Sequence, residues 1–404
     1  MKILYFSQFY FPENAAASFR ATEHSRIWNK EGHEVTIFTT YPNFPSGKIN
    51  DGYSNRLLSE EYIDSIRVLR SKIFTTKNTS KIKKIISSLS YIILGLVNFI
   101  FNRKKIGKKY DCVLGTSGTI FNGILAYIYS KVIRKPFIFE LRDLTYIQLL
   151  AVYSEKQTLI YHIIKFIEIY LCKQAKAVVV VTVGFKKKLS EEGIYDKKIS
   201  VIFNGIQISE EEEKEKVYLE EVNNKFIISY MGNLGQSQNL EYIIDVFNKL
   251  NINNKELYFI GEGAIKGKLK KISESYNDIF ILDGMTRDKL DKYYKVSDVC
   301  VVSLKNSDMF KATIPSKIFE IMYKNKMILF FGPHGEATSI IEKSRSGIVC
   351  SSNINDEEIT YLSNKLLDKK YVKECGELGH KFVVDNFDRK KLAFEYIRML
   401  EQLI

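Results

Sequence analysis

The residues best suited to chemistry are Lys317 and Glu320, which follow a Pro-Ser pair. Pro315 and Ser316 favour a helix start, because proline suits the first helical turn and serine caps it. The free N–H groups of that turn attract an anion, and Lys317 opposes the helix dipole unless an anion lies nearby. Glu320 falls on the same face one turn later. A lysine for phosphates and a carboxylate for sugar hydroxyls suit a nucleotide sugar; the alternative is an ordinary amphipathic helix with surface charges.

Glycine turns after two apolar strands provide further candidates. The run Gly232-Asn233-Leu234-Gly235-Gln236 follows the predicted strand Phe226–Met231 and precedes a helix, with Ser237 as its expected cap. Bare backbone in such a turn can approach a diphosphate closely. The run Gly261-Glu262-Gly263 ends the next strand, where either a nucleotide base lies against the backbone or the glycines serve the turn alone.

Asp143 follows the predicted strand Phe137–Arg142, at the edge of the sheet where ligands bind in alternating α/β folds. A carboxylate there can orient or deprotonate an acceptor hydroxyl. The structural alternatives are an ion pair with Arg142 or a helix cap.

Several functional classes are disfavoured. The first strand–helix turn, Ser7–Ala17, contains no glycine, whereas a dinucleotide fingerprint needs three, and no P-loop sequence occurs. The five cysteines are scattered and neither they nor the histidines show metal-ligand spacing, which indicates a reducing compartment and no metal site. The N-terminal sequence also lacks the features of a signal peptide.

The chain of 404 residues, 45% hydrophobic, is long enough for two domains of roughly 200 residues each. Continuous apolar strands alternate with helices twice, which predicts two doubly wound parallel sheets. We expect an N-terminal domain at 1–208, a Glu-rich linker at 209–224 and a C-terminal domain at 225–385. A last helix, within 386–404, is expected to pack across the domain boundary.

The net charge of +13 is concentrated between Ser65 and Tyr110, a stretch that contains twelve Lys or Arg residues and no Asp or Glu. These cations flank the apolar run Ile85–Phe101, so a lipid surface is a better partner than nucleic acid. A helix formed by this run has only a narrow polar stripe. We expect that the helix either is buried or has one side in contact with lipid. A membrane crossing would place strands of one sheet on opposite sides of the membrane. The residues predicted to contact the membrane are Lys81, Lys83, Lys84, Ile93, Leu96, Arg103, Lys104 and Lys105.

Over nearly its whole length the chain resembles glycosyltransferases of the GT-B fold, in the retaining family 4. The resemblance is carried by Ile314–Met322, Gly232–Gly235, Phe139–Leu144, Phe9–Glu13 and Tyr41–Gly47, and is nearest to the capsule and O-antigen subgroup that includes the fucosamine transferases. It implies two Rossmann-like domains facing across a cleft and metal-independent transfer from a nucleotide-diphosphate sugar, most readily UDP-linked. It further implies an undecaprenyl-diphosphate-linked saccharide acceptor on the inner face of the cytoplasmic membrane.

The resemblance also assigns residues. Lys317 holds the diphosphate, Glu320 the donor ribose, and Asp143 the acceptor. The other donor-binding predictions are Gly232, Asn233, Leu234, Gly235, Gln236, Gly261, Glu262, Met285, Pro315 and Ser316. The acceptor-binding predictions are Pro12, Glu13, Ala16, Arg20, Asn43 and Arg142.

Three positions depart from the family pattern. Ala312 replaces the first glutamate of a paired motif, Gln236 a phosphate-binding lysine, and Arg142 a histidine. These departures leave open the possibility that the protein is a non-catalytic, membrane-associated member of a polysaccharide assembly complex. A further alternative is a GT-B epimerase that acts on the nucleotide sugar itself.

Overall fold

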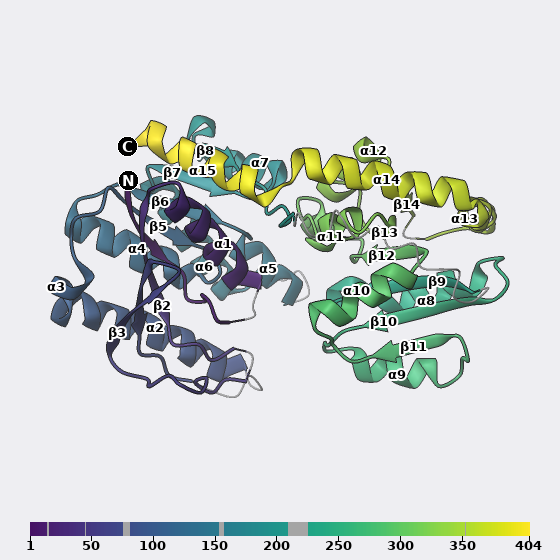
Figure 1. The fold of residues 1–404 in the computed structure, drawn as a ribbon, viewed down its shortest axis with the longest axis horizontal. Helices are drawn as coiled ribbons and strands as arrows, with labels where there is room; N and C mark the ends of the chain where they lie inside the picture. Colours follow the sequence, from purple (N-terminus) through teal and green to yellow (C-terminus); the bar gives the residue numbers. More distant parts are fainter. Residues whose placement is uncertain (14–15, 45, 76–80, 153–156, 209–224, 352) are drawn as a thin grey trace. The chain divides into compact units, whose positions relative to one another are not determined.

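The computed structural model describes residues 1–13, 16–44, 46–75, 81–152, 157–208, 225–351 and 353–404 (Figure 1). These form two compact units. The first consists of Met1–Asn204 together with Lys390–Ile404, and the second of Gly205–Arg389. The expected linker at 209–224 lies outside the described residues.

In the described part of the first unit, a sheet has the order β3-β4-β2-β1-β5-β6-β7-β8, with β3 antiparallel to β4 and all other neighbours parallel. Its strands are β1 (Lys2–Phe6), β2 (Glu34–Thr40), β3 (Leu58–Ile63), β4 (Ile66–Ser71), β5 (Cys112–Thr116), β6 (Phe137–Leu141), β7 (Ala177–Val180) and β8 (Ile199–Val201). Its helices are α1 (Ala16–Lys30), α2 (Lys81–Phe101), α3 (Arg103–Ile106), α4 (Ile120–Ile133), α5 (Thr145–Val152), α6 (Leu159–Gln174), α7 (Val183–Glu191) and α15 (Arg389–Leu403).

The second unit contains a parallel sheet in the order β11-β10-β9-β12-β13-β14. Its strands are β9 (Phe226–Met231), β10 (Lys255–Ile260), β11 (Ile279–Leu282), β12 (Val299–Ser303), β13 (Met327–Phe331) and β14 (Gly347–Cys350). Its helices are α8 (Leu240–Lys249), α9 (Lys266–Ser273), α10 (Arg287–Val296), α11 (Lys317–Tyr323), α12 (Glu336–Ser344), α13 (Asp356–Leu367) and α14 (Lys369–Asn386), with 3-10 turns η2 (Gln236–Gln238) and η3 (Asp308–Phe310). The prediction of two doubly wound sheets is confirmed.

The last helix completes the core of the first unit. Leu392, Tyr396 and Leu400 of α15 are buried in the same cluster as Trp28 of α1. The Trp28 indole N–H also donates to the Ala393 carbonyl at 2.9 Å. Although α15 follows the second unit along the chain, its apolar face therefore belongs to the first.

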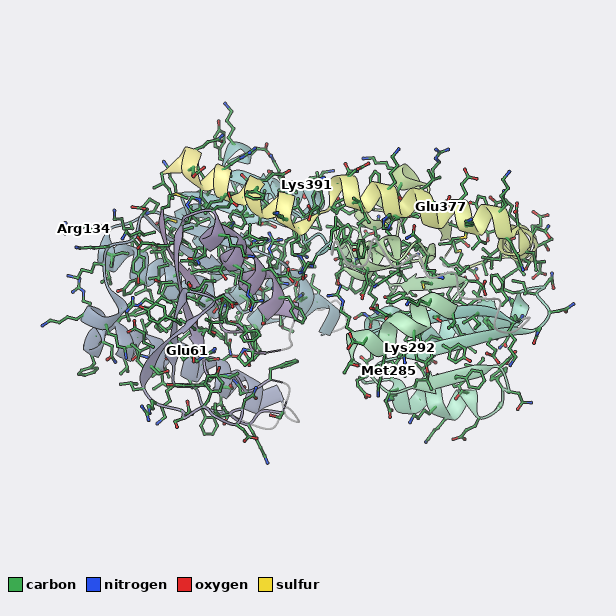
Figure 2. All side chains as sticks on the ribbon, viewed as in Figure 1. Glu61, Arg134, Met285, Lys292, Glu377 and Lys391 are labelled. Atoms are coloured by element: carbon green, nitrogen blue, oxygen red, sulfur yellow. The ribbon has the colours of Figure 1, made fainter. Side chains whose placement is uncertain are left out.

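Two strands, β3 and β4, were missed because charged residues interrupt them. Arg70 on β4 is fully buried, and its guanidinium donates to Glu61 of β3, labelled in Figure 2, and to the carbonyls of Thr40 and Phe11. The basic stretch predicted to face lipid from Ser65 onward therefore begins inside the sheet, and its first arginines are structural.

The helix α2 buries its polar stripe. Tyr91 and Asn98 are fully buried, and the Asn98 side chain donates to the Leu57 carbonyl and to Ser71 Oγ, both at 2.9 Å. The apolar residues face outward instead. Its exposed apolar side chains are Ile86, Leu89, Ile93, Ile100 and Phe101. Because Asn98 and Tyr91 fix this face of α2 inside the fold, the exposed apolar side chains on its other side are left for solvent or for a partner.

Candidate functional site

The strand order of the second sheet reverses beside β9, because β10 and β11 lie on one side and β12 to β14 on the other. Ligands of doubly wound sheets bind at the carboxyl ends of the strands at such a point. Lys317 begins α11, after β12, and its side chain reaches the turn after β9. A Cβ added to Gly232 would lie 2.2 Å from Lys317 Nζ, and Gly232 has a φ of +135°. The sequence-predicted lysine and glycine turn therefore meet at the switch point.

Tyr230, on β9, is a further part of this site. Lys317 Nζ lies 4.0 Å from the centroid of the Tyr230 ring, which is a cation–π contact. Sequence reasoning missed it, because a strand tyrosine under a cation looks like any other core tyrosine. Among the residues that the structure describes, Lys317 forms no ion pair.

Burial lowers the pKa of Lys317 to about 7, and the neighbouring Glu320 opposes this shift. An ammonium held by an aromatic ring and bare backbone lacks the counter-charge that would keep it protonated at neutral pH. A bound diphosphate would supply that counter-charge. The geometry is thus suited to an anion.

Glu320 lies half-buried one turn along α11. Burial raises its pKa, while Arg287 and Lys324 act in the opposite direction. Burial and the Glu320 carboxylate also raise the pKa of Tyr294, on α10. Glu320 is therefore a hydrogen-bonding group on the same helix as Lys317, as its spacing predicted.

The helix-start prediction at α11 is wrong in detail. Pro315 precedes the helix, and Ser316 occupies the cap position in a helical conformation without a side-chain capping hydrogen bond. The expected cap Ser237 lies inside η2 with Gln236, and α8 begins only after Asn239. The favourable feature is the lysine against the glycine turn rather than capped helix ends.

The glycines after β10 serve structure. A Cβ on Gly261 would lie 1.8 Å from the Gly232 carbonyl oxygen, and one on Gly263 would lie 2.2 Å from that of Leu234. The Leu234 N–H donates to the Glu262 carbonyl at 2.8 Å, so the two turns are joined. This favours the turn interpretation over a base lying on bare backbone.

The other residues predicted to bind the nucleotide sugar lie near the same edge of the sheet. The exposed Glu262 carboxylate accepts from Lys266 Nζ at 2.7 Å and from the Gly284 N–H at 3.0 Å. Met285, labelled in Figure 2, is half-buried directly after this glycine. Asn233 is exposed, and its carbonyl accepts from the Tyr230 hydroxyl at 2.8 Å.

In the first unit, several of the residues predicted to bind the acceptor saccharide lie after the carboxyl ends of β1 and β2. Glu13 is buried, and its Oε1 accepts from the N–H groups of Asn43 and Phe44 at 2.9 and 3.0 Å. Its Oε2 is also buried and meets no hydrogen-bond partner in the described part of the chain. Pro12 lies beside it, and Ala16 begins α1. Glu13 thus holds the loop after β2 and keeps one oxygen for a further donor.

Arg20, predicted to bind the acceptor, has structural partners inside the fold instead of a free guanidinium. It is buried, with Nε 2.9 Å from Glu140 Oε1 and with its NH groups donating to the carbonyls of Phe203 and Ile202. Glu140 also accepts from the Tyr5 hydroxyl at 3.0 Å. Burial alone would raise the pKa of Glu140, but Arg20 and Arg142 hold it below its usual value.

Arg142 belongs to the same electrostatic cluster, because burial lowers its pKa while Glu140 acts in the opposite direction. The adjoining Asp143 carboxyl reaches solvent, and the protein packed around it raises its pKa against the effect of Arg142. Asp143 is therefore the exposed member of this edge, where a hydroxyl acceptor could meet it.

Glu168, on α6, was not predicted. Its Oε1 accepts from the Thr145 N–H and hydroxyl at 3.1 and 2.7 Å, at the start of α5. Burial raises the pKa of Glu168 to about 7. A single glutamate in an apolar helix gives no local sign of this role.

We expect Glu168→Gln to stabilise the protein at pH 8. The folded state holds a proton on Glu168 up to about pH 7, whereas the unfolded chain releases it near 4.5, so stability falls as the pH rises between these values. Glutamine keeps the acceptor without the buried charge, which predicts a gain on the order of 1–3 kcal/mol at pH 8 and none at pH 4. Urea unfolding at both pH values measures this, and a less stable variant at pH 8 would contradict it.

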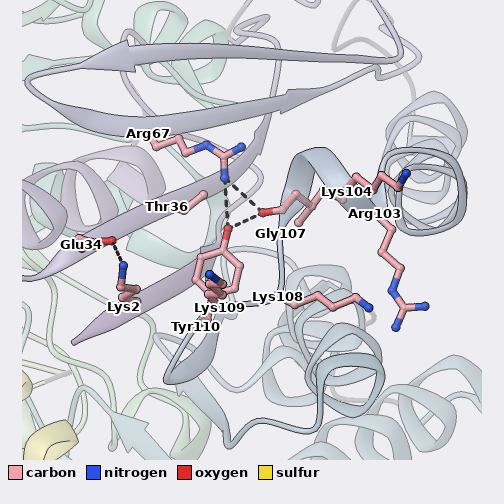
Figure 3. Close-up of a pocket in the computed structure, with 11 residues that line it drawn as sticks. Lys2, Glu34, Thr36, Arg67, Arg103, Lys104, Gly107, Lys108, Lys109 and Tyr110 are labelled. Carbon is pink, nitrogen blue, oxygen red and sulfur yellow. Dashed lines mark hydrogen bonds and ion pairs between the residues drawn. The ribbon is translucent and has the colours of Figure 1, made fainter.

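A basic pocket of about 660 Å³ lies at the opposite, amino-terminal edge of the first sheet (Figure 3). The Lys2 ammonium pairs with Glu34 at 2.7 Å, and the Arg67 guanidinium donates to the Ile106 carbonyl and the Tyr110 hydroxyl. Four more lining cations have no ion pair among the described residues; they are Arg103, Lys104, Lys108 and Lys109.

Most of the predicted membrane residues whose side chains the structure describes are exposed. Ile93 and Lys105 are exposed and Leu96 is half-buried, whereas the side chains of Lys81, Lys83 and Lys84 lie outside the described residues. Within the described ranges, no helix is both long enough and apolar enough to cross a membrane, and no group of three acidic, His or Cys side chains could hold a metal.

Comparison with known proteins finds similarity to glycosyltransferases. Residues 211–382 match the family Glycosyl transferases group 1. An uncharacterized glycosyltransferase of Methanocaldococcus jannaschii is 24% identical over 415 residues, covering 100% of this chain and 99% of that protein. The putative colanic acid biosynthesis glycosyl transferase WcaI of Escherichia coli K12 is 22% identical over 335 residues, 80% of this chain and 81% of that protein.

Among solved structures, Anabaena HepE in complex with UDP superposes with a TM-score of 0.69 at 13% identity, over 100% of both chains. At that identity the likeness shows the fold. The chain therefore has the GT-B fold of two doubly wound sheets, and residues 211–382 of it match the model of the group 1 glycosyl transferases.

Proposed function

We propose that this protein is a retaining glycosyltransferase that moves a sugar from a nucleotide-diphosphate sugar to a lipid-linked saccharide in the synthesis of a bacterial surface polysaccharide. UDP is the favoured nucleotide, and N-acetylated amino or deoxyamino sugars are the favoured donors. The observation that carries the proposal is Lys317, half-buried against the Gly232 turn at the switch point of the second sheet, with no ion pair among the described residues.

The relatives support this proposal. The structural relative HepE is described as a complex with UDP, and the relative WcaI as a putative colanic acid biosynthesis enzyme. In this chain the same fold provides a lysine where a diphosphate would lie and a glutamate one turn later for the ribose hydroxyls.

The mechanism we propose is a front-face displacement at the anomeric carbon. Negative charge develops on the leaving diphosphate, and the Lys317 ammonium stabilises it without a metal ion. The leaving phosphate oxygen takes the proton of the acceptor hydroxyl, while Asp143 orients that hydroxyl. A closing motion that brings the acceptor to the donor would also exclude water and limit donor hydrolysis.

The purified protein tests this proposal directly. A panel of UDP-, GDP- and dTDP-sugars in a thermal-shift assay should show stabilisation by one nucleotide class, because a bound donor stabilises the fold by mass action. Transfer to a lipid-linked acceptor should follow with that donor. Turnover of the nucleotide sugar without any acceptor would instead favour the epimerase, and no turnover at all would favour the non-catalytic partner.

Glu320→Ala should weaken nucleotide binding by about 1–3 kcal/mol, the cost of losing a charged hydrogen bond. Its place one turn after Lys317 motivates this prediction. Isothermal titration calorimetry with UDP measures it. The exposed Glu342, on α12 of the same unit, is the matched control, and an unchanged Kd for the Glu320 variant would exclude the ribose role.

Asp143→Asn should reduce transfer while nucleotide binding stays unchanged, because Asp143 belongs to the first unit and Lys317 to the second. Asparagine keeps the size but loses the charge that orients the hydroxyl. The measurement pairs a transfer assay with UDP titration. A collapsed melting transition would instead assign Asp143 to the ion-pair network of Arg142.

The lipid-linked acceptor implies contact with a bilayer, and we propose that α2 and α3 provide it. The exposed apolar stripe of α2 ends in Ile100 and Phe101, which are 73% and 76% exposed, directly before the Arg103–Lys105 cations. The four unpaired cations of the basic pocket lie in the same region (Figure 3). Apolar insertion beside cations suits an anionic lipid surface, with about 1 kcal/mol for each cation.

Flotation with vesicles of varied anionic lipid content tests this contact. Binding should rise with anionic lipid and fall with salt. Exchanging Arg103, Lys104 and Lys105 for Glu should abolish binding, whereas exchanging Lys268, Lys270 and Lys271 of the second unit should not. A protein that stays in solution with anionic vesicles at low salt does not dock by this surface.

A further inference from the structure

The helix α6 carries a second outward apolar strip, which its periodicity alone did not reveal. Phe166 is 72% exposed and Leu159 is 75% exposed, and Ile163 lies between them on the same face. The buried side of the helix consists of Tyr161, Glu168, Leu171 and Cys172. Large apolar side chains on a contiguous surface strip indicate a contact surface.

This strip is continuous with α4 through an aromatic cluster. The Tyr170 and Tyr127 hydroxyls are 3.1 Å apart, and their ring centroids are separated by 5.9 Å. Phe166 stacks on Tyr170 at 6.3 Å, while Lys131 Nζ lies 5.3 Å from the Tyr127 ring. Tyrosines and a lysine beside exposed aliphatic groups are typical of side chains at the boundary between lipid tails and headgroups.

The charge of the helical layer favours one occupant. The helix α4 packs against α2 and also against α6. These three helices contain a single carboxylate, Glu168, and it is fully buried. Lys131 and Lys173 are exposed beside the strip. In a contact between two copies like charges would meet, whereas an anionic lipid surface complements them.

We propose that the outward strip of α6, with the Tyr127–Tyr170 pair, is a second lipid-contact surface that lies on an anionic bilayer together with α2. This inference rests on the membrane contact proposed above and extends it to an element outside the basic segment. Two strips, on helices that both pack against α4, hold the layer against the bilayer, because binding at the second strip becomes intramolecular once the first is bound.

A tryptophan introduced on the surface as a fluorescent reporter provides the test. The chain contains one tryptophan, Trp28, and it is fully buried, so a tryptophan placed on the surface adds its signal to a constant background. Phe166→Trp on α6, Phe101→Trp on α2 and, as control, Tyr361→Trp on α13 are mixed with brominated phosphatidylcholine–phosphatidylglycerol vesicles. We expect quenching of the first two and none of the third.

A second pair of variants measures the contribution to binding. Ile163→Asp with Phe166→Asp should reduce vesicle partitioning by about tenfold or more, since two apolar side chains leave the lipid. Tyr361→Asp with Leu367→Asp on α13, which are also exposed, should leave it unchanged. Melting temperature and UDP binding of each variant show that the fold is retained.

The outcomes separate this inference from the proposed function. Quenching at position 101 but not at 166 overturns the α6 surface and leaves α2 as the only contact. No quenching at either position overturns both lipid surfaces, while transfer to a water-soluble acceptor still tests the enzymatic proposal. If the α6 variant instead converts a dimer to a monomer in light scattering, with vesicle binding unchanged, the strip is an interface between copies and the inference is wrong.

Discussion

Replacing Lys317 by alanine should reduce glycosyl transfer by roughly 10²–10³-fold when the nucleotide sugar is saturating. This is the range seen when an enzyme loses one hydrogen-bonding group that stabilises the negative charge of the transition state. The lysine is half-buried over Tyr230 and against Gly232, and it has no ion pair among the described residues. Alanine removes this ammonium but leaves Glu320 with Arg287 and Lys324 as nearby cations, so we expect the fold to be retained, which the melting temperature of the variant checks. The exposed Lys311, which pairs with Asp308 at 2.7 Å just before the same helix, is the control.

The pH dependence of nucleotide binding adds an independent readout. With a pKa of about 7 in the free protein, Lys317 loses its proton above neutrality. A bound diphosphate favours the charged form, so binding takes up a proton and weakens by up to about tenfold for each pH unit above 7. Calorimetry in buffers of different ionisation enthalpy measures this uptake. Near-normal kcat and unchanged proton uptake in the alanine variant would exclude the role.

The second large effect concerns stability. Arg20→Leu should lower the free energy of unfolding by about 3–5 kcal/mol at pH 7, because it leaves the buried Glu140 carboxylate without its closest counter-charge. The loss should shrink as the pH falls, since burial then raises the pKa of Glu140 and protonation removes the unpaired charge. Chemical denaturation at pH 7 and pH 5 measures both statements.

Arg26 is the matched control for this experiment. It lies on the same helix, and its guanidinium pairs with Asp64 at 2.6 Å on the exposed surface. Surface ion pairs contribute at most about 1 kcal/mol, so Arg26→Leu should cost little. If the two variants are equally stable and only acceptor binding suffers in Arg20→Leu, the original ligand interpretation of Arg20 is correct after all.

The sheets were predictable because their signal is local. Runs such as Ala177–Val180 are continuously apolar, as strands buried on both faces must be, and each is followed by a helix. The strands β3 and β4 were not predictable, since the buried Arg70 is compensated by Glu61 and by distant carbonyls. Glu61 becomes a neighbour of Arg70 only when β3 pairs with β4, and the Thr40 and Phe11 carbonyls come from segments 30 and 59 residues away in the sequence.

The candidate site also has a part that was predictable from the sequence and a part that was not. Lys317 and the Gly232 turn were found because a cation at a helix start and a glycine turn after a strand are each unusual locally. Three other features were not found from the sequence, because they depend on which helices and strands become neighbours. They are the position of Tyr230, the Arg20–Glu140 pair and the exposure of Phe166. The polar stripe of α2 was recognised, but only its hydrogen bonds to β4 and the loop before β3 show that it faces inward.

The position of α15 has a consequence for the order in which the protein is made. Domains generally fold as units during synthesis, with the N-terminal one first. Here the second unit is an uninterrupted stretch, Gly205–Arg389, whereas the first needs Lys390–Ile404 to cover Trp28. The half that leaves the ribosome first is therefore completed only after the second unit has been made, and until Lys390–Ile404 is synthesised the apolar side chains around Trp28 are open to chaperones.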